Sequence, residues 1–246
     1  VGMDNIDVDY AEEKGLKVIN TPASSSQSVA ELVMAHLFNI SRNVFDSNRN
    51  MPKNGETEFK VLKKKYAKGI ELRGKNLGII GFGRIGQNTA KYALGAGMNV
   101  IAYDPFIDEA KIELSIAEQI IKVNISTTNI NYLLEKSDFI SLHVPMPEDG
   151  KPVIGSGEFK MMKDGVRLVN AARGGVVDEN ALIDAIKTEK VSFAALDVFV
   201  GEPKPSKDLL LNDKISITPH IGAATLEAQD RIGTELADKI INFYNQ

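Results

Sequence analysis

NLGIIGFGRIG, residues 76–86, carries the strongest indication of the fold of this chain. It joins an apolar run to a G-x-G-x-x-G turn, and a helical pattern follows the turn. In that context Gly81 permits the tight turn, Gly83 lets the backbone approach a pyrophosphate, and Gly86 lets helix and strand pack closely. The free N–H groups at the start of the helix would face the phosphates. The stretch therefore predicts a strand–turn–helix unit that binds a dinucleotide.

A carboxylate at the end of the next predicted strand supports this interpretation. The strand over residues 99–103 is followed by Asp104, and 104 − 86 = 18 residues separate it from Gly86. An acid near this spacing binds the adenosine ribose and repels a 2′-phosphate. We therefore expect NAD rather than NADP. The alternative is an ordinary glycine turn with a surface aspartate.

From residue 76 onward, runs rich in Val and Ile alternate with helical patterns, as is typical of βαβ units. The predicted fold is α/β, a doubly wound parallel sheet of Rossmann type. Strands are expected over residues 76–80, 99–103, 121–124, 138–143, 167–170, 191–197 and 215–218. Helices are expected to start near Arg84, Asp108, Asn129, Ser156 and Asp178. The last of these residues is a predicted N-cap.

The segment before residue 76 is less regular. A short helix is expected over residues 7–14, a strand over 16–20 and an apolar helix over 28–41. His36 in that apolar helix matches no chemical motif and is expected to be structural. Residues 43–69 show little periodicity, so we expect an exposed excursion, with its lysine run 63–65 solvated rather than bound to an anion.

Composition excludes several classes of protein. The 246 residues are 43% hydrophobic and 25% charged, with a net charge of −4, which suits one large globular domain or two small ones. The acidic balance argues against a nucleic-acid partner. With no Cys and three His, neither a disulfide nor a metal site is expected. No membrane span or signal peptide is predicted, and the expected location is cytoplasmic.

Three polar segments follow predicted strands, where open α/β sheets bind ligands. They are residues 170–175, 197–203 and 218–222. The Arg173 guanidinium suits a carboxylate, and His220 can move a proton near neutral pH. Glu202 could orient that imidazole and stabilise its protonated form. Each residue also has a structural alternative: an end cap for Arg173, a loop acid for Glu202 and a core histidine for His220.

The order of these segments resembles the D-isomer-specific 2-hydroxyacid dehydrogenases. The resemblance rests on GFGRIG 81–86, HVP 143–145, NAARGG 170–175, ALDVF 195–199, GEP 201–203 and TPHIG 218–222. It runs from Val1 almost to the end of the chain. Within the family, the phosphoglycerate dehydrogenase branch is the most similar, through VGMDNID 1–7 and ELRGK 71–75.

The resemblance implies roles for the matching residues. Arg173 would bind the substrate carboxylate, His220 would be the acid/base and Glu202 its partner. Asp197 would bind the nicotinamide carboxamide. The other cofactor contacts implied are Gly81, Gly83, Arg84, Ile85, Gly86, Asp104, His143, Val144, Pro145, Ala171, Ala172, Gly222 and Ala223. No metal is implied.

The activity implied is hydride transfer between nicotinamide and C2 of a D-2-hydroxy acid, with 3-phosphoglycerate expected first. Alternatives are a glyoxylate or hydroxypyruvate reductase, and an NAD(H)-sensing binding protein of the same fold. Where relatives often have Gly-Asn, this chain has Ala23-Ser24-Ser25-Ser26.

The resemblance also implies a division of the chain, because family members carry a further N-terminal part. Residues 1–23 are expected to be the remnant of a flavodoxin-like substrate domain, residues 24–222 the NAD-binding domain, and residues 223–246 a C-terminal helix returning to the substrate domain. The helix over residues 28–41 and the excursion after it resemble the family's dimer contacts, so a homodimer is expected.

Overall fold

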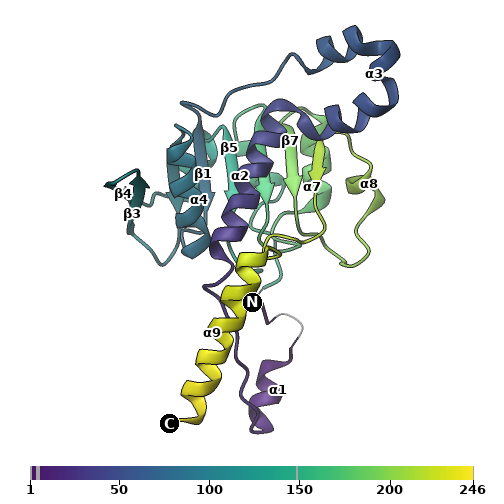
Figure 1. Ribbon diagram of the computed structural model, residues 1–246. Coiled ribbons are helices and arrows are strands. Elements are labelled where there is room, and N and C mark those ends of the chain that lie inside the picture. Colours follow the sequence, from purple (N-terminus) through teal and green to yellow (C-terminus); the bar gives the residue numbers. More distant parts are fainter. Residues whose placement is uncertain (1, 4–5, 148, 246) are drawn as a thin grey trace.

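The computed structural model describes residues 2–3, 6–147 and 149–245. They form one sheet of six parallel strands in the order β2-β1-β5-β6-β7-β8, with helices on both faces (Figure 1). The strands are β1 (Asn76–Ile80), β2 (Asn99–Tyr103), β5 (Phe139–Leu142), β6 (Val166–Asn170), β7 (Val191–Leu196) and β8 (Ile215–Ile217). The doubly wound fold is confirmed. The strand order reverses between β1 and β5, and ligands bind at such a switch point.

Helices α2 and α4 lie on one face of the sheet, and α5, α6 and α7 pack into the core on the other. The helices are α1 (Val8–Glu13), α2 (Ser26–Arg42), α3 (Val44–Tyr66), α4 (Arg84–Gly95), α5 (Ile130–Lys136), α6 (Ser156–Met161), α7 (Glu179–Lys187), α8 (Lys207–Leu210) and α9 (Leu226–Tyr244). The predicted N-cap of α7 is confirmed, since Asp178 accepts hydrogen bonds from the N–H groups of Asn180 and Ala181, each at 3.0 Å.

The two apolar cores explain why the central strands read as continuous hydrophobic runs. All four residues of β5 are buried. Leu37 of α2 and Ala90 of α4 pack in one core, and Leu133 of α5 and Leu182 of α7 pack in the other. Because each strand is covered on both faces, its side chains must be apolar in both directions.

One predicted element between β2 and α5 is wrong, and another lies outside the main sheet. The helix expected from Asp108 is instead β3 (Glu109–Ile116), whereas the strand expected over residues 121–124 is confirmed as part of β4 (Gln119–Ser126). These strands pair antiparallel with each other, outside the main sheet. Only one face of this hairpin is covered, where Ile112 and Ile125 enter the core beside α4. Alternation with period two was the signal for it.

Two further predictions before β1 are wrong. The described residues 16–20 form no strand, and residues 43–69 are largely helical rather than irregular, as α3. Helix α3 bends at Glu58, and its two arms meet, because the Tyr66 hydroxyl donates to Asp46 Oδ2 at 2.8 Å. The expected exposure is confirmed, since Phe45 and Leu62 alone are buried among the residues of α3.

Helices α1 and α9 project away from the sheet (Figure 1). Within α9, Ala228 alone is buried. The helix is held to residues near the start of α2: Lys239 donates to the Asn20 carbonyl at 2.7 Å, Arg231 donates to the Ser24 carbonyl at 2.9 Å, and the Ser24 hydroxyl donates to Glu235. Within the described ranges, no helix combines the length and the apolar character that a membrane crossing requires.

Candidate active site

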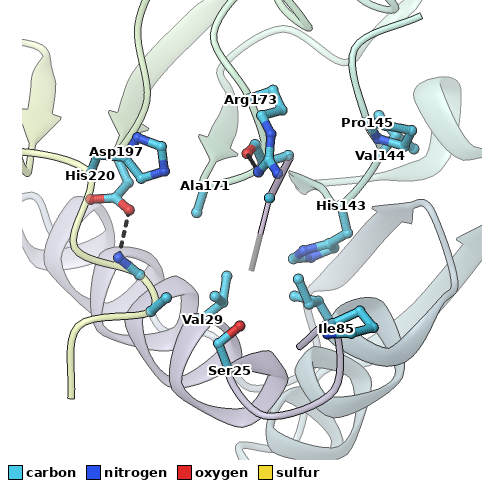
Figure 2. A pocket seen from close by; sticks show the side chains of 15 residues that line it. Ser25, Val29, Ile85, His143, Val144, Pro145, Ala171, Arg173, Asp197 and His220 are labelled. Atoms are coloured by element: carbon cyan, nitrogen blue, oxygen red, sulfur yellow. Dashed lines mark hydrogen bonds between the residues drawn. The ribbon is translucent and has the colours of Figure 1, made fainter. Parts of the chain in front are cut away.

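Most of the predicted site residues meet in one pocket of about 440 Å³ at the carboxyl ends of the strands (Figure 2). Those that line it are Ile85, His143, Val144, Pro145, Ala171, Ala172, Arg173, Asp197, His220, Gly222 and Ala223. Gly81, Gly83, Arg84, Gly86, Asp104 and Glu202 are not among its lining residues. The pocket therefore joins segments from five strand ends that lie far apart in the sequence.

The three glycines of the turn after β1 are explained by different surroundings at each position. Gly81 has a φ of 92°, and a Cβ there would lie 2.6 Å from the His143 carbonyl oxygen. A Cβ at Gly86 would overlap the Gly81 carbonyl oxygen. At Gly83 a Cβ would meet no described atom within 4 Å. Glycine is therefore dictated by packing at the first two positions, whereas at Gly83 it leaves open space beside the helix N-terminus, which fits a pyrophosphate.

Asp104 lies where it was predicted, directly after β2 and beside the glycine turn. Its Oδ2 accepts from the Phe82 N–H at 2.7 Å, and its Oδ1 accepts from the Phe106 N–H at 2.9 Å. These bonds occupy two of the roughly four acceptor positions of a carboxylate. The side chain can therefore hold the turn and still accept from ribose hydroxyls.

His143 contributes an unpaired polar atom. Its imidazole extends toward the pocket (Figure 2), with Nε2 2.9 Å from the Ser141 hydroxyl. Nδ1 is buried and has no hydrogen-bond partner among the described residues. Burial lowers the pKa of His143 to about 3, so the ring is neutral near pH 7. An orphaned nitrogen is costly unless something pairs with it, and a bound dinucleotide carries suitable groups.

His220 and Glu202 form the predicted pair, although 18 residues separate them. Nδ1 of His220 lies 2.8 Å from Glu202 Oε2, and Glu202 Oε1 accepts from the Phe199 N–H at 2.8 Å. Partial burial raises the pKa of Glu202, but the hydrogen bonds from His220 and Phe199 and the charge of Arg173 outweigh it and lower the pKa overall. An ionised carboxylate only accepts, so the proton lies on Nδ1, and Nε2 is left for a substrate.

Arg173 reaches the pocket from the turn after β6 (Figure 2). Asn170 shapes that turn: its Oδ1 accepts from the Ala172 N–H, and its Nδ2 donates to the Arg173 carbonyl, both at 3.0 Å. Nη1 of Arg173 donates to the Ala172 carbonyl at 2.8 Å. A guanidinium held by its own turn presents its charge to the pocket with little further loss of freedom.

Asp197 is buried, with 1% of its surface exposed, and it anchors the loop that carries His220. Its Oδ1 accepts from the Thr218 hydroxyl at 2.6 Å and from the Ile221 N–H at 2.9 Å, and its Oδ2 accepts from the Gly222 N–H at 2.8 Å. About one acceptor position remains on this carboxylate. Asp197 therefore combines an anchoring role with a site for one ligand donor.

Sequence reasoning missed part of the pocket wall. Gly2, Pro22, Ser25 and Val29 also line it, and the last two stand at the start of α2. The only sequence signal for them was that residues 23–26 differ from the Gly-Asn often found in relatives. That difference draws attention to this loop but not to the residues around it. His36, which was expected to be structural, is buried. The lysine run 63–65, which was expected to be solvated, is exposed, and Lys65 pairs with Asp46 at 2.7 Å.

Comparison with known proteins identifies the family. Residues 34–222 match the D-isomer specific 2-hydroxyacid dehydrogenase, NAD binding domain. The chain is 46% identical to a hydroxypyruvate reductase of Thermotoga maritima, over 98% of this chain and 74% of the relative. It is 45% identical to a D-3-phosphoglycerate dehydrogenase of Methanocaldococcus jannaschii, over 98% of this chain and 43% of the relative.

A solved structure agrees with these relatives. The D-lactate dehydrogenase from Aquifex aeolicus, complexed with NAD and lactic acid, superimposes with a TM-score of 0.76 at 32% identity, over 99% of this chain and 74% of that chain. The protein therefore belongs to the D-isomer specific 2-hydroxyacid dehydrogenases, a family of NAD-dependent oxidoreductases. It contains the NAD-binding domain of that family, and it spans less than half of the Methanocaldococcus relative.

Proposed function

We propose that this protein is a dehydrogenase that transfers a hydride between nicotinamide and C2 of a D-2-hydroxy acid. The observation that carries the proposal is one pocket lined by Arg173, Asp197 and His220, with Ile85 from beside the glycine turn in its wall and with Glu202 hydrogen-bonded to His220. When bound, NAD supplies the hydride acceptor or donor, and the protein supplies position and charge.

Each catalytic residue has one task in this proposal. Arg173 binds the substrate carboxylate and polarises the neighbouring C2 oxygen. His220 takes the hydroxyl proton on Nε2 during oxidation and returns it during reduction. Glu202 holds Nδ1–H and stabilises the imidazolium that forms. The hydrogen bond between Nδ1 of His220 and Oε2 of Glu202 is 2.8 Å long, which suits that role.

NAD would lie across the carboxyl ends of the strands, with each of its parts bound by residues from a different strand end. Gly81, Gly83 and Gly86, with Arg84 and Ile85, would bind the pyrophosphate. Asp104 would bind the adenosine ribose, and residues 143–145 would line the adenosine side. Asp197 would hold the carboxamide with its remaining acceptor position, beside Ala171, Ala172, Gly222 and Ala223. The open space at Gly83 and the orphaned Nδ1 of His143 support this placement.

For the substrate we propose 3-phosphoglycerate, which places the enzyme at the start of serine synthesis in the cytoplasm. Support comes from the phosphoglycerate dehydrogenase relatives, which include those of Methanocaldococcus jannaschii and Archaeoglobus fulgidus at 45% and 43% identity. Hydroxypyruvate is the second candidate, because the Thermotoga maritima relative at 46% identity carries the name of that reductase.

We propose further that residues 1–23 and 223–246 belong to a substrate domain and residues 24–222 to the NAD-binding domain. Support comes from α9, on which Ile240, Ile241 and Phe243 are exposed although apolar. A homodimer through α2 and α3 is proposed on similar grounds, since α3 exposes Phe59 and Val61 at 57% and 63%. Exposed apolar surface of this kind is typical of an interface.

The function is tested by titrating NADH into this chain and into the complete product of its gene, followed by turnover assays. The substrates are 3-phosphoglycerate, D-glycerate and D-lactate with NAD, and hydroxypyruvate with NADH. We expect both proteins to bind NADH and the complete gene product to oxidise 3-phosphoglycerate. His220→Ala should abolish turnover and leave NADH affinity unchanged, because the imidazole moves the proton and not the cofactor.

Each contrary outcome has a separate meaning. Turnover of hydroxypyruvate without 3-phosphoglycerate would select the second substrate. NADH binding without turnover of any acid would reject the enzyme in favour of a sensor of NADH. Failure of this chain to bind NADH would reject the nucleotide site, and near-wild-type turnover in His220→Ala would reject His220 as the acid/base.

A further inference from the structure

Helix α2 makes a series of polar contacts to β8 and the loop that follows it. The Ser28 hydroxyl donates to the Gly222 carbonyl at 2.7 Å, and Asn39 Nδ2 donates to the Ser216 hydroxyl at 2.9 Å. Between them, His36 Nε2 lies 3.1 Å from the Thr218 hydroxyl oxygen. His36 is 2% exposed, in a helix whose buried face is otherwise largely apolar. Burying a polar ring there is costly unless its hydrogen bond has a purpose.

The direction of each hydrogen bond follows from the chemistry of the groups. Asp197 as a carboxylate only accepts, so the Thr218 hydroxyl donates its proton across the 2.6 Å contact to Oδ1. The Thr218 oxygen can then only accept from the imidazole, and His36 must carry its proton on Nε2. Burial lowers the pKa of His36, and the Asp197 charge opposes this only in part. The ring is therefore neutral and its single proton lies on Nε2.

The same carboxylate holds the backbone around His220. Asp197 accepts from the N–H groups of Ile221 and Gly222, the two residues directly after His220. His220 itself has a φ of 53°, in the left-handed region that non-glycine residues rarely adopt. Such a conformation persists when its surroundings determine it. The Asp197 carboxylate thus anchors the two backbone N–H groups that directly follow His220.

We propose that His36 is a positioning residue for this site. By donating from Nε2 to the Thr218 oxygen, it fixes the threonine hydroxyl in the place from which it donates to Asp197, and so holds both the carboxylate and the His220 loop. Its kinetic consequence rests on the proposed function, but its effect on the loop does not. His36 touches neither substrate nor cofactor in this role and acts only through Thr218 and Asp197.

Three variants of the complete gene product separate positioning from packing. His36→Leu fills the space but donates nothing. His36→Gln keeps a side-chain N–H donor and is the conservative rescue. Asn39→Leu is the matched control, because it removes another contact from α2 to β8, near His36, that does not reach Asp197. For each we would measure kcat, the KM for NAD and for the hydroxy acid, thermal unfolding, and amide exchange at Ile221 and Gly222 by NMR.

We expect His36→Leu to lower kcat about tenfold or more, because small displacements of reacting groups are costly. The KM for NAD should change less than about twofold, because the glycine turn is untouched. Amide exchange at Ile221 and Gly222 should become faster, while exchange within β8 does not. In His36→Gln, both kcat and the amide exchange at Ile221 and Gly222 should return most of the way to their wild-type values. Asn39→Leu should lower the stability of the fold but change neither kcat nor the amide exchange at Ile221 and Gly222.

The proposal is overturned if His36→Leu matches Asn39→Leu in both kcat and amide exchange. If the wild type turns over no hydroxy acid, the proposed function fails, and amide exchange still decides the positioning role. If His36→Leu does not fold, His36→Met replaces it, since methionine also fills the space and donates nothing. That variant should then show the faster exchange at Ile221 and Gly222, and exchange like that of the wild type would overturn the proposal.

Discussion

At the scale of single residues, Gly83 and Gly86 belong to one turn but are glycines for different reasons. We expect Gly86→Ala to destabilise the fold by about 1–3 kcal/mol, because its methyl group overlaps the Gly81 carbonyl. Gly83→Ala meets no described atom, so stability should change by less than about 1 kcal/mol. NADH affinity should nevertheless fall about tenfold or more, because the methyl group takes the space of the pyrophosphate.

Urea unfolding and NADH fluorescence titration measure the two quantities separately. Each glycine variant is the control of the other, since the same methyl group is added within one turn. Wild-type NADH affinity in Gly83→Ala would contradict the assignment of this turn to the pyrophosphate.

His143 makes stability depend on pH in a predictable direction. Its pKa in the folded protein is about 3, below the ordinary value of 6.5, because the ring is buried. Between these values the unfolded chain binds more protons, so the folded state loses stability as pH falls from 6.5 toward 3. His143→Gln should remove this dependence, which amounts to about 1.4 kcal/mol for each pH unit. The measurement is the free energy of unfolding of the wild type and of His143→Gln between pH 7.5 and 5. If it changed with pH equally in both proteins, the prediction would be contradicted.

At the scale of elements, α3 depends on a polar cluster rather than on a core. Asp46 accepts from the Tyr66 hydroxyl at 2.8 Å, pairs with Lys65 at 2.7 Å, and bonds Asn50 at 2.9 Å. Burial raises the pKa of Asp46, but these partners outweigh it and lower the pKa overall. The cluster therefore persists at neutral pH and is lost only as pH falls through that lowered value.

Asp46→Ala should separate the two arms of α3. We expect faster tryptic cleavage at lysines 63–65, with a loss of global stability of about 1 kcal/mol or less, because the cluster is partly exposed. Asp149→Ala is the control, since it removes an exposed pair with Lys151 and leaves α3 intact. Equal cleavage rates in both variants would contradict a role of Asp46 in holding the arms.

The differences between prediction and structure lie in elements without a complete core. Residues 43–69 look irregular because α3 is mostly polar, buries only Phe45 and Leu62, and bends at Glu58, so its apolar residues are sparse. The strand β3 was misread as a helix because only Ile112 and Leu114 of its eight residues are buried, so its alternation of apolar and polar side chains is short. By contrast, the strands of the main sheet were predictable, because two buried faces leave a continuous apolar run.

At the scale of the whole molecule, the proposed homodimer predicts the size of the particle in solution. Sedimentation equilibrium at micromolar concentration should give twice 26.8 kDa. Phe59→Asp on α3 should shift the equilibrium toward monomer, because it places a charge in apolar surface at the interface. Ile120→Asp is the matched control, an equally exposed apolar residue on the β3–β4 hairpin. A monomeric wild type, or equal effects of the two substitutions, would contradict a dimer through α3.

The strand–turn–helix unit, the strand ends that carry Arg173, Asp197 and His220, and the family could all be predicted from the amino-acid sequence. Local periodicity and glycine spacing encode the unit and the strand ends, because each depends on residues close together in the chain, and the order of short motifs along the chain indicates the family. The contact of His36 in α2 with Thr218, 182 residues away, and the place of Ser25 and Val29 in the pocket wall could be seen in the folded chain alone. An apolar pattern predicts that one face of a helix is buried, but it does not predict which element covers that face. These contacts arise because α2 packs against β8.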